Sequence, residues 1–152
     1  QMVILGLGEE KYHKFLKNAE KKYKNKLAIH IGFNETLAHQ IEAAADMFLM
    51  PSKYEPCGLN QMYSLRYGTV PIVRNTGGLS DTIIDYRKPN GNGFLFDKYD
   101  SNELLKAILT ALSLYKDKPK WNKLVRQGMS LDFSWKVSAA KYMKLYKDVA
   151  SS

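Results

Sequence analysis

Short apolar runs alternate with longer amphipathic stretches along the first hundred residues. The run at 47–50, Met-Phe-Leu-Met, is continuous and stops at Pro51, which is typical of a parallel strand covered on both faces. The stretch at 9–24 repeats apolar residues on one side only, as an amphipathic helix does. This alternation predicts an α/β fold with a Rossmann-like, doubly wound parallel sheet. The predicted strands are 2–7, 27–31, 47–50, 70–73 and 94–96, and the helices between them are 9–24, 35–45, 58–67 and 79–85.

The last third of the chain predicts helices only. Asp100 is suited to cap the first of them, with Glu103 completing a capping box. Pro119 begins the second, which ends near Gly128, and Ser134 caps the third. The third helix carries a stripe formed by Trp135, Ala139, Tyr142 and Tyr146.

The composition describes one domain that can bury a core. The chain has 152 residues, of which 45% are hydrophobic and 25% charged, and no Gly/Pro/Ser-rich linker divides it. A single cysteine, Cys57, excludes an internal disulfide and a cysteine-based zinc site. No apolar run approaches the roughly 20 residues of a membrane span, and no segment has the pattern of a signal peptide. These features predict a cytoplasmic protein with no membrane partner.

The formal net charge of +8 allows a polyanionic partner. Residues 11–26 are rich in lysine, and Tyr12, Phe15 and Tyr23 interleave with the lysines, which superficially resembles a nucleic-acid-binding surface. The aromatic residues follow the apolar face of the predicted helix and the lysines follow the rest. We therefore favour a solvated amphipathic helix and expect no nucleic-acid partner.

Four loops follow predicted strands, at 6–8, 32–35, 51–58 and 74–79. Doubly wound sheets bind ligands beyond the carboxyl ends of their strands, so we expect these loops to converge on one site. The strongest signal is the segment 51–61, Pro-Ser-Lys-Tyr-Glu-Pro-Cys-Gly-Leu-Asn-Gln. Two prolines stiffen this loop and hold Glu55 at the end of a strand.

Gly58 and Leu59 begin the following helix, whose free N–H groups and positive dipole end suit a phosphate. A carboxylate beside an anion site is explained by a sugar nucleotide, with pyrophosphate on the helix and sugar hydroxyls on Glu55. From the residues alone, a plain helix start with a surface glutamate is an equal alternative.

Two weaker signals lie at the ends of other strands. The segment 74–79, Arg-Asn-Thr-Gly-Gly-Leu, contains paired glycines that let the backbone approach a ligand, although taken alone it is more typical of a plain strand-to-helix turn. Its expected place on the same sheet edge as Glu55 favours the binding interpretation. Phe33 could stack on a nucleobase, but taken alone it is more typical of an ordinary core or surface aromatic.

Other chemistry fits less well. Gly6 and Gly8 begin a dinucleotide fingerprint, but Lys11 stands where the third glycine is needed, so we reject a nicotinamide cofactor. His30 and His39 have no acid at ligand spacing, and we expect no metal site. Cys57 at a helix N-terminus could be a nucleophile, yet a small residue packed beside a ligand explains it better.

Taken together, the loop sequences resemble those of the C-terminal domain of bacterial-type glycogen synthases and plant starch synthases. These are retaining glucosyltransferases of the GT-B fold. The run Glu-Pro-Cys-Gly-Leu followed by Thr-Gly-Gly-Leu is highly diagnostic, and the resemblance extends nearly from end to end. The matching segments are 38–46, 51–61, 66–71, 74–82, 128–129, 132–135 and the aromatic last helix.

The resemblance implies roles for individual residues. Glu55 matches the family's essential acid, which contacts the donor glucose, and Cys57 matches a residue lining that pocket. Tyr63 stands where broader GT-B enzymes carry a second glutamate, so Glu55 is not assigned as a nucleophile. Further residues match the backbone that receives the distal phosphate (Gly58, Leu59 and Asn60), the aromatic over the adenine (Phe33) and the loop beside the glucose (Thr76, Gly77 and Gly78).

The same resemblance implies that parts of the enzyme lie outside residues 1–152. Gln1 is followed directly by an apolar run, so we expect a piece that lacks the domain's first strand, its Arg/Lys loop and the N-terminal acceptor domain. The whole enzyme would transfer glucose from ADP-glucose to the 4-OH of an α-1,4-glucan with retention, in the cytoplasm or in a plant plastid. It implies no metal or other cofactor, and the isolated piece is expected to be inactive. The alternatives are a UDP-glucose-dependent glucosyltransferase and a non-catalytic module that binds nucleotide or glucan.

Overall fold

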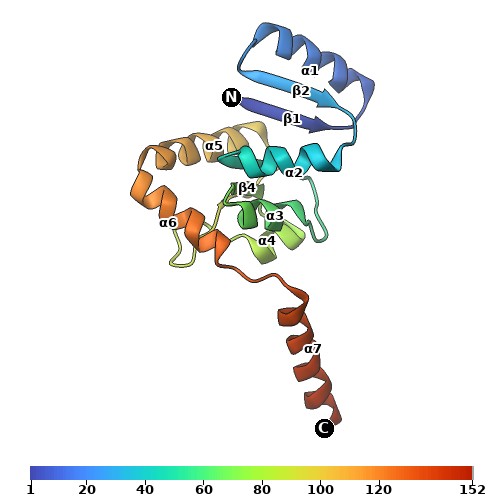
Figure 1. Ribbon diagram of the computed structural model, residues 1–152, viewed down its shortest axis with the longest axis vertical. Helices are drawn as coiled ribbons and strands as arrows, with labels where there is room; N and C mark the ends of the chain where they lie inside the picture. The colour runs from blue at the N-terminus through green and yellow to red at the C-terminus, as the bar shows by residue number, and fades with distance from the viewer. Residues whose placement is uncertain (152) are drawn as a thin grey trace. The chain divides into compact units, whose positions relative to one another are not determined.

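The computed structural model describes residues 1–151 and divides them into two units, the first from Gln1 to Ala44 and the second from Ala45 onward. Parallel strands alternate with helices in both units, which confirms the predicted α/β class (Figure 1). The strands form two sheets, one of two strands in the order β1-β2 and one of three in the order β3-β4-β5.

The first unit contains two strands and two helices: β1 (Met2–Gly6), α1 (Glu10–Lys22), β2 (Leu27–Ile31) and α2 (Glu35–Ala44). The strands β1 and β2 pair in parallel, from Met2 opposite Leu27 to Gly6 opposite Ile31. Side chains of α1 bind the backbone of β2. The Glu20 carboxylate accepts from the N–H of Ile29 at 2.6 Å, and the Lys17 ammonium donates to the Ile29 carbonyl at 2.9 Å. The Ile29 N–H and then Lys17 hold the pKa of Glu20 below its ordinary value.

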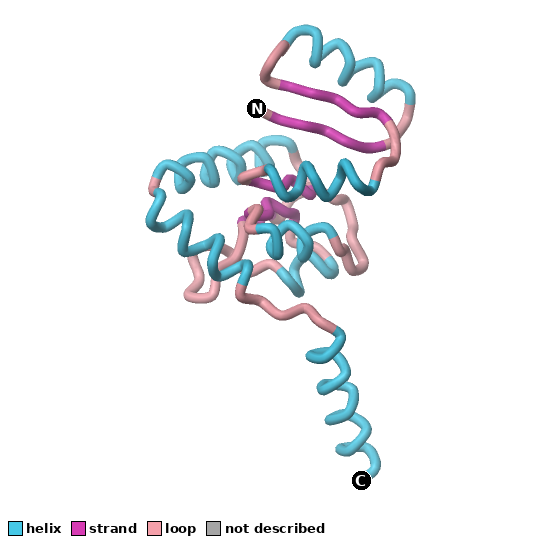
Figure 2. Tube along the Cα trace, viewed as in Figure 1, coloured by secondary structure: helices cyan, strands magenta, loops and turns pink. Residues whose placement is uncertain are grey.

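The second unit is built around the three-stranded sheet, whose strands pair in parallel. Figure 2 colours strands magenta and helices cyan. Its elements are β3 (Met47–Met50), α3 (Asn60–Tyr67), β4 (Val70–Arg74), α4 (Gly77–Thr82), β5 (Phe94–Phe96), α5 (Ser101–Lys116), α6 (Lys118–Met129) and α7 (Trp135–Ala150).

The central strand β4 is buried on both faces because its side chains alternate between two clusters. Val70 and Ile72 pack with Phe94 and with residues of α5 and α6, among them Trp121. Val73 lies in the other cluster, with Leu65 of α3 and with Leu79 and Ile83. Full burial of each such side chain stabilises the fold by about 1.5–3 kcal/mol. The sequence predicted two covered faces for the run at 47–50, which is β3; the side chains of that strand are only half-buried, and full burial belongs to β4.

Several predicted boundaries differ from the structure. Helix α3 begins at Asn60 and not at residue 58, because Gly58 has a φ of 73° and lies outside the helical region. Helix α4 spans Gly77–Thr82 where the sequence indicated 79–85, since Ile83 is already extended. Helix α6 has Asp117 as its N-cap, and Pro119 lies within its first turn.

The caps are also only partly as predicted. The Asp100 carboxylate accepts from the N–H groups of Asn102 and Glu103, as expected. The reciprocal half of the capping box is absent, because the N–H of Asp100 donates to the Lys98 carbonyl. Ser134 occupies the N-cap position of α7 without a side-chain cap bond.

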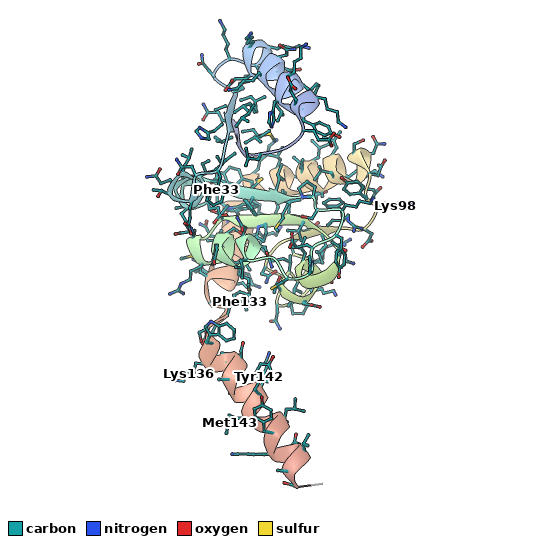
Figure 3. All side chains as sticks on the ribbon, turned by 90° about the vertical axis from the view of Figure 1, so that its right-hand side faces the viewer. Phe33, Lys98, Phe133, Lys136, Tyr142 and Met143 are labelled. Atoms are coloured by element: carbon teal, nitrogen blue, oxygen red, sulfur yellow. The ribbon has the colours of Figure 1, made fainter. Side chains whose placement is uncertain are left out.

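The aromatic stripe of α7 does not pack against the rest of the unit. None of the residues of α7 is buried, and Trp135 is 85% exposed. Tyr142 and Met143, labelled in Figure 3, are each more than half exposed. The stripe that the sequence indicated is present, but it covers no core in the described residues.

A tight turn follows α4. The Arg87 guanidinium donates to both carboxylate oxygens of Asp85, at 2.7 and 3.1 Å, and its backbone N–H donates at 3.0 Å. Burial of Asp85 opposes its ionisation, but these bonds and the charge of Arg87 outweigh burial and hold the pKa of Asp85 below its ordinary value.

Candidate functional site

The two glycine-containing motifs of the second unit meet at the carboxyl ends of β3 and β4. The loop at 51–58 follows β3, and the segment at 75–78 follows β4, its parallel neighbour. The N–H of Gly78 donates to the carbonyl oxygen of Glu55 at 2.9 Å. A Cβ atom on Gly77 would overlap that same oxygen, and one on Gly78 would overlap the carbonyl of Cys57. Only glycine therefore allows the two backbones to approach so closely.

Helix α3 begins without a side-chain cap. Leu59 is the N-cap residue, and its apolar side chain provides no cap bond. Gly58, with a φ of 73°, lies in the left-handed region that favours glycine and turns the loop into the helix. Backbone N–H groups in the first turn of a helix are able to bind an anion. The predicted phosphate role of Gly58, Leu59 and Asn60 is compatible with this arrangement and stays a prediction.

A buried glutamine that the sequence reasoning missed links the two loops. The side chain of Gln61 is fully buried, and its Nε2 donates to the carbonyls of Cys57 and Gly58 at 3.1 and 2.9 Å. It also donates to Thr82 Oγ1 at 3.2 Å, and that hydroxyl donates to the Gly78 carbonyl at 2.8 Å. Gln61 and Thr82 thus connect the Glu55 loop with the Gly77–Gly78 turn. Their separation of 21 positions leaves no local sequence signal for this contact.

The predicted side chains of the second unit are accessible. Glu55 is half-buried and Cys57 is an exposed free thiol, whose sulfur lies 3.6 Å from the Gly58 carbonyl. Thr76 is the extended N-cap residue of α4. The structure therefore brings Glu55, Cys57 and Gly58 together with Thr76, Gly77 and Gly78, as the shared sheet edge predicted.

Phe33 belongs to the first unit, where it follows β2 and Gly32. Its side chain is 84% exposed and is labelled in Figure 3. A core role for this aromatic is thereby excluded in the described structure. Its predicted role as a base platform, which requires a ring face open to a ligand, stays a prediction.

A groove of about 710 Å³ runs from Leu59 along α3 to the connection between α6 and α7. Tyr63 and Arg66 of α3 line one part of it, and Phe133 and Trp135 line another. Leu59 belongs both to this groove and to the start of α3, so the N-terminal end of this helix borders a concave surface.

The described residues hold neither a metal-binding cluster nor a membrane-spanning helix. Among residues 1–151, no three His, Cys, Asp or Glu side chains gather as a metal site would require. In the same part of the chain, no helix combines the length and apolar character needed to cross a membrane.

Residues 1–128 match the family described as glycosyl transferases group 1. The chain belongs to this glycosyltransferase family. The predicted membership of a glycosyltransferase family is thereby confirmed.

This glycosyltransferase chain is similar to bacterial glycogen synthases and to a plant starch synthase. The glycogen synthase of Thermosipho melanesiensis is 53% identical over 154 residues, covering 99% of the chain and 32% of the relative. That of Koribacter versatilis is 50% identical over 147 residues, covering 95% and 30%. A solved catalytic domain of starch synthase IV from Arabidopsis thaliana, bound to ADP and acarbose, has a TM-score of 0.85 and 38% identity, covering 100% of the chain and 33% of that structure. The chain spans about a third of the length of these relatives.

Proposed function

We propose that this chain is the donor-binding part of a glycogen (starch) synthase. The whole enzyme would transfer glucose from ADP-glucose to the non-reducing end of an α-1,4-glucan, with retention. The observation that carries the proposal is the close packing of the Glu55–Cys57 backbone on Gly77 and Gly78, which gathers the residues of two diagnostic motifs at one sheet edge. The glycogen synthases of similar sequence and the ADP-bound starch synthase support it.

In this proposal the bond between C1 of glucose and the oxygen of the diphosphate breaks. A new bond forms from C1 to the 4-hydroxyl oxygen of the glucan, whose proton is released, and ADP leaves. Backbone N–H groups of Gly58, Leu59 and Asn60 stabilise the charge on the distal phosphate at the start of α3. Glu55 and Cys57 face the donor sugar, with Thr76, Gly77 and Gly78 beside it. Phe33 stacks on the adenine.

Acceptor binding and neutralisation of the diphosphate would be functions of the whole protein. Because the chain spans about a third of its relatives, the acceptor-binding residues and the cations that neutralise the departing diphosphate would lie outside it. We accordingly expect the isolated 152-residue chain not to elongate glucan. The reaction would take place in the cytoplasm, or in the plastid if the source is a plant, and would need no cofactor.

A glucan-extension assay of the full-length protein tests the proposal. ADP-glucose and UDP-glucose are offered separately, and incorporation of labelled glucose is measured. We expect incorporation from ADP-glucose at a clearly higher kcat/KM. Incorporation from UDP-glucose alone would favour a UDP-glucose-dependent glucosyltransferase. Nucleotide binding without any transfer would favour a non-catalytic module.

A further inference from the structure

Arg74, the last residue of β4, donates hydrogen bonds to two of the loops that follow the strands. Its Nε donates to the Ser52 carbonyl at 2.9 Å, and its Nη2 donates to the Lys53 carbonyl. Its Nη1 donates to the carbonyl of Asp97 at 3.2 Å. The guanidinium lies 5.9 Å from the ring centre of Tyr99. All three nitrogens of one side chain therefore hold backbone carbonyls from two different segments.

This geometry suits arginine in particular. The guanidinium is planar, keeps its charge at all physiological pH values and presents donors in a fixed fork. Hydrogen bonds from a charged donor are stronger than neutral ones, and here the donor is half-buried, where solvent screens it less. A lysine side chain has a single ammonium nitrogen, so it cannot replace the three nitrogens with which the guanidinium reaches three carbonyls at once.

The segment held by Arg74 leads directly to Glu55. Lys53 lies two positions before Glu55, and the Glu55 carbonyl is itself held by the N–H of Gly78. The backbone is thus fixed on the approach to Glu55 and again at Glu55. Because the backbone is held at two nearby points, the position of the Glu55 Cα atom and the direction of its side chain are restricted.

We propose that Arg74 is a positioning residue that fixes the Ser52–Lys53 backbone and thereby orients Glu55 for glucosyl transfer. The inference rests on the proposed function for its catalytic part. It assigns Arg74 no contact with the donor, because its nitrogens are engaged by protein carbonyls. A cation that bound the diphosphate directly would act differently, through nucleotide affinity.

Limited trypsin digestion of the full-length protein tests the structural part. The peptide bond after Lys53 includes the carbonyl that Arg74 holds, so cleavage there reports release of the loop. We expect Arg74→Met to raise the cleavage rate after Lys53 at least tenfold, with unchanged rates after Lys106 and Lys123 in α5 and α6. Arg66→Met is the matched control, since Arg66 makes a single 3.4 Å bond to the Met129 carbonyl, and should leave Lys53 protected. Equal rises at all three lysines, or no rise at Lys53, would overturn the proposal.

Steady-state kinetics of the full-length protein test the catalytic part. Arg74→Met should lower kcat at least tenfold and change the donor KM and the affinity for ADP less than threefold. If Arg74→Met does not fold, Arg74→Lys keeps the charge and should shift the same quantities in the same direction by a smaller factor. A parallel loss of ADP affinity, or an unchanged kcat, would refute positioning by Arg74.

The two experiments separate failure of this inference from failure of the proposed function. If the unmodified full-length protein transfers no glucose, the proposed function fails, and the catalytic role of Arg74 fails with it, while the digestion still decides whether Arg74 holds the loop. If the unmodified protein is active and Arg74→Met keeps its kcat, only the inference on Arg74 fails.

Discussion

The backbone N–H of Gly78 lies 2.9 Å from the carbonyl oxygen of Glu55, and this bond joins the loop after β3 to the first turn of α4. The two residues come from motifs that are separated by an entire helix and strand. Their contact holds the Glu55 loop against the paired-glycine turn.

Gly78→Ala tests this contact. The new Cβ would overlap the Cys57 carbonyl, which is backbone and has little freedom to move, so we expect a loss of about 1–3 kcal/mol in the free energy of unfolding. Urea unfolding followed by circular dichroism measures it. Gly6→Ala is the control, because no atom lies within 4 Å of its added Cβ. Equal stability of Gly78→Ala and the unmodified chain would contradict the described packing.

Glu55→Gln, in the full-length protein, should lower turnover far more than it weakens nucleotide binding. A carboxylate that contacts the sugar acts on the charge that develops in the transition state, and its loss should cost on the order of 3 kcal/mol, about a hundredfold in rate. ADP would be bound by the start of α3 and by an aromatic ring instead. Kinetics and ADP titration decide the matter: if affinity for ADP falls in step with kcat, Glu55 is not a sugar-contacting residue.

Phe33→Ala should raise the donor KM tenfold or more, since a base stacked on an aromatic contributes about 1–3 kcal/mol. Its side chain is 84% exposed, so the melting temperature without nucleotide should be nearly unchanged. Phe33→Tyr is the matched control and should be close to neutral, because stacking needs only a ring face. An unchanged donor KM in Phe33→Ala would rule out the base platform.

Asp85→Asn should destabilise the chain in a pH-dependent manner. The folded-state pKa of Asp85 is lowered, so its contribution is complete above the unfolded pKa of about 3.9 and is lost as the pH falls through the folded value. Because the Arg87 side chain is 72% exposed, screening limits the loss at pH 7 to about 1 kcal/mol.

Fluorescence of buried Trp121 in a Trp135→Phe background follows the unfolding of the Asp85 variant in the second unit. The difference between Asp85→Asn and its parent should shrink below about pH 4. A constant difference between pH 7 and pH 3 would contradict an ionised Asp85 paired with Arg87.

Local patterns predicted most of the elements because the physical causes were local. The apolar runs at 47–50 and 70–73 became β3 and β4, and Asp100 caps α5 as its position indicated. The predicted start of α3 was wrong by two residues because Gly58 has a left-handed φ of 73°, and its carbonyl accepts from the Gln61 side chain at 2.9 Å. The Gln61 side chain is in turn buried and bonded to Thr82 Oγ1, 21 positions away, and no local pattern encodes that contact.

The candidate site was predictable in its loops and not in its supports. Glu55 and the paired glycines stand out as short motifs after apolar runs. Arg74 and Thr82 act through contacts with residues about 20 positions away, and their residue types are ordinary for the ends of strands and helices. The stripe of α7 has the spacing of a packed helix, yet none of its residues is buried. Periodicity shows that a helix has an apolar face, but not which surface covers that face.

The bonds between α1 and β2 have a consequence for how the protein behaves at high concentration. An open strand edge is a template on which another chain can add a strand and begin to aggregate. At Ile29 both the donor and the acceptor of that edge are occupied, by the carboxylate of Glu20 and the ammonium of Lys17. Because these side chains occupy the backbone groups of Ile29, another strand cannot form hydrogen bonds with β2 at this residue.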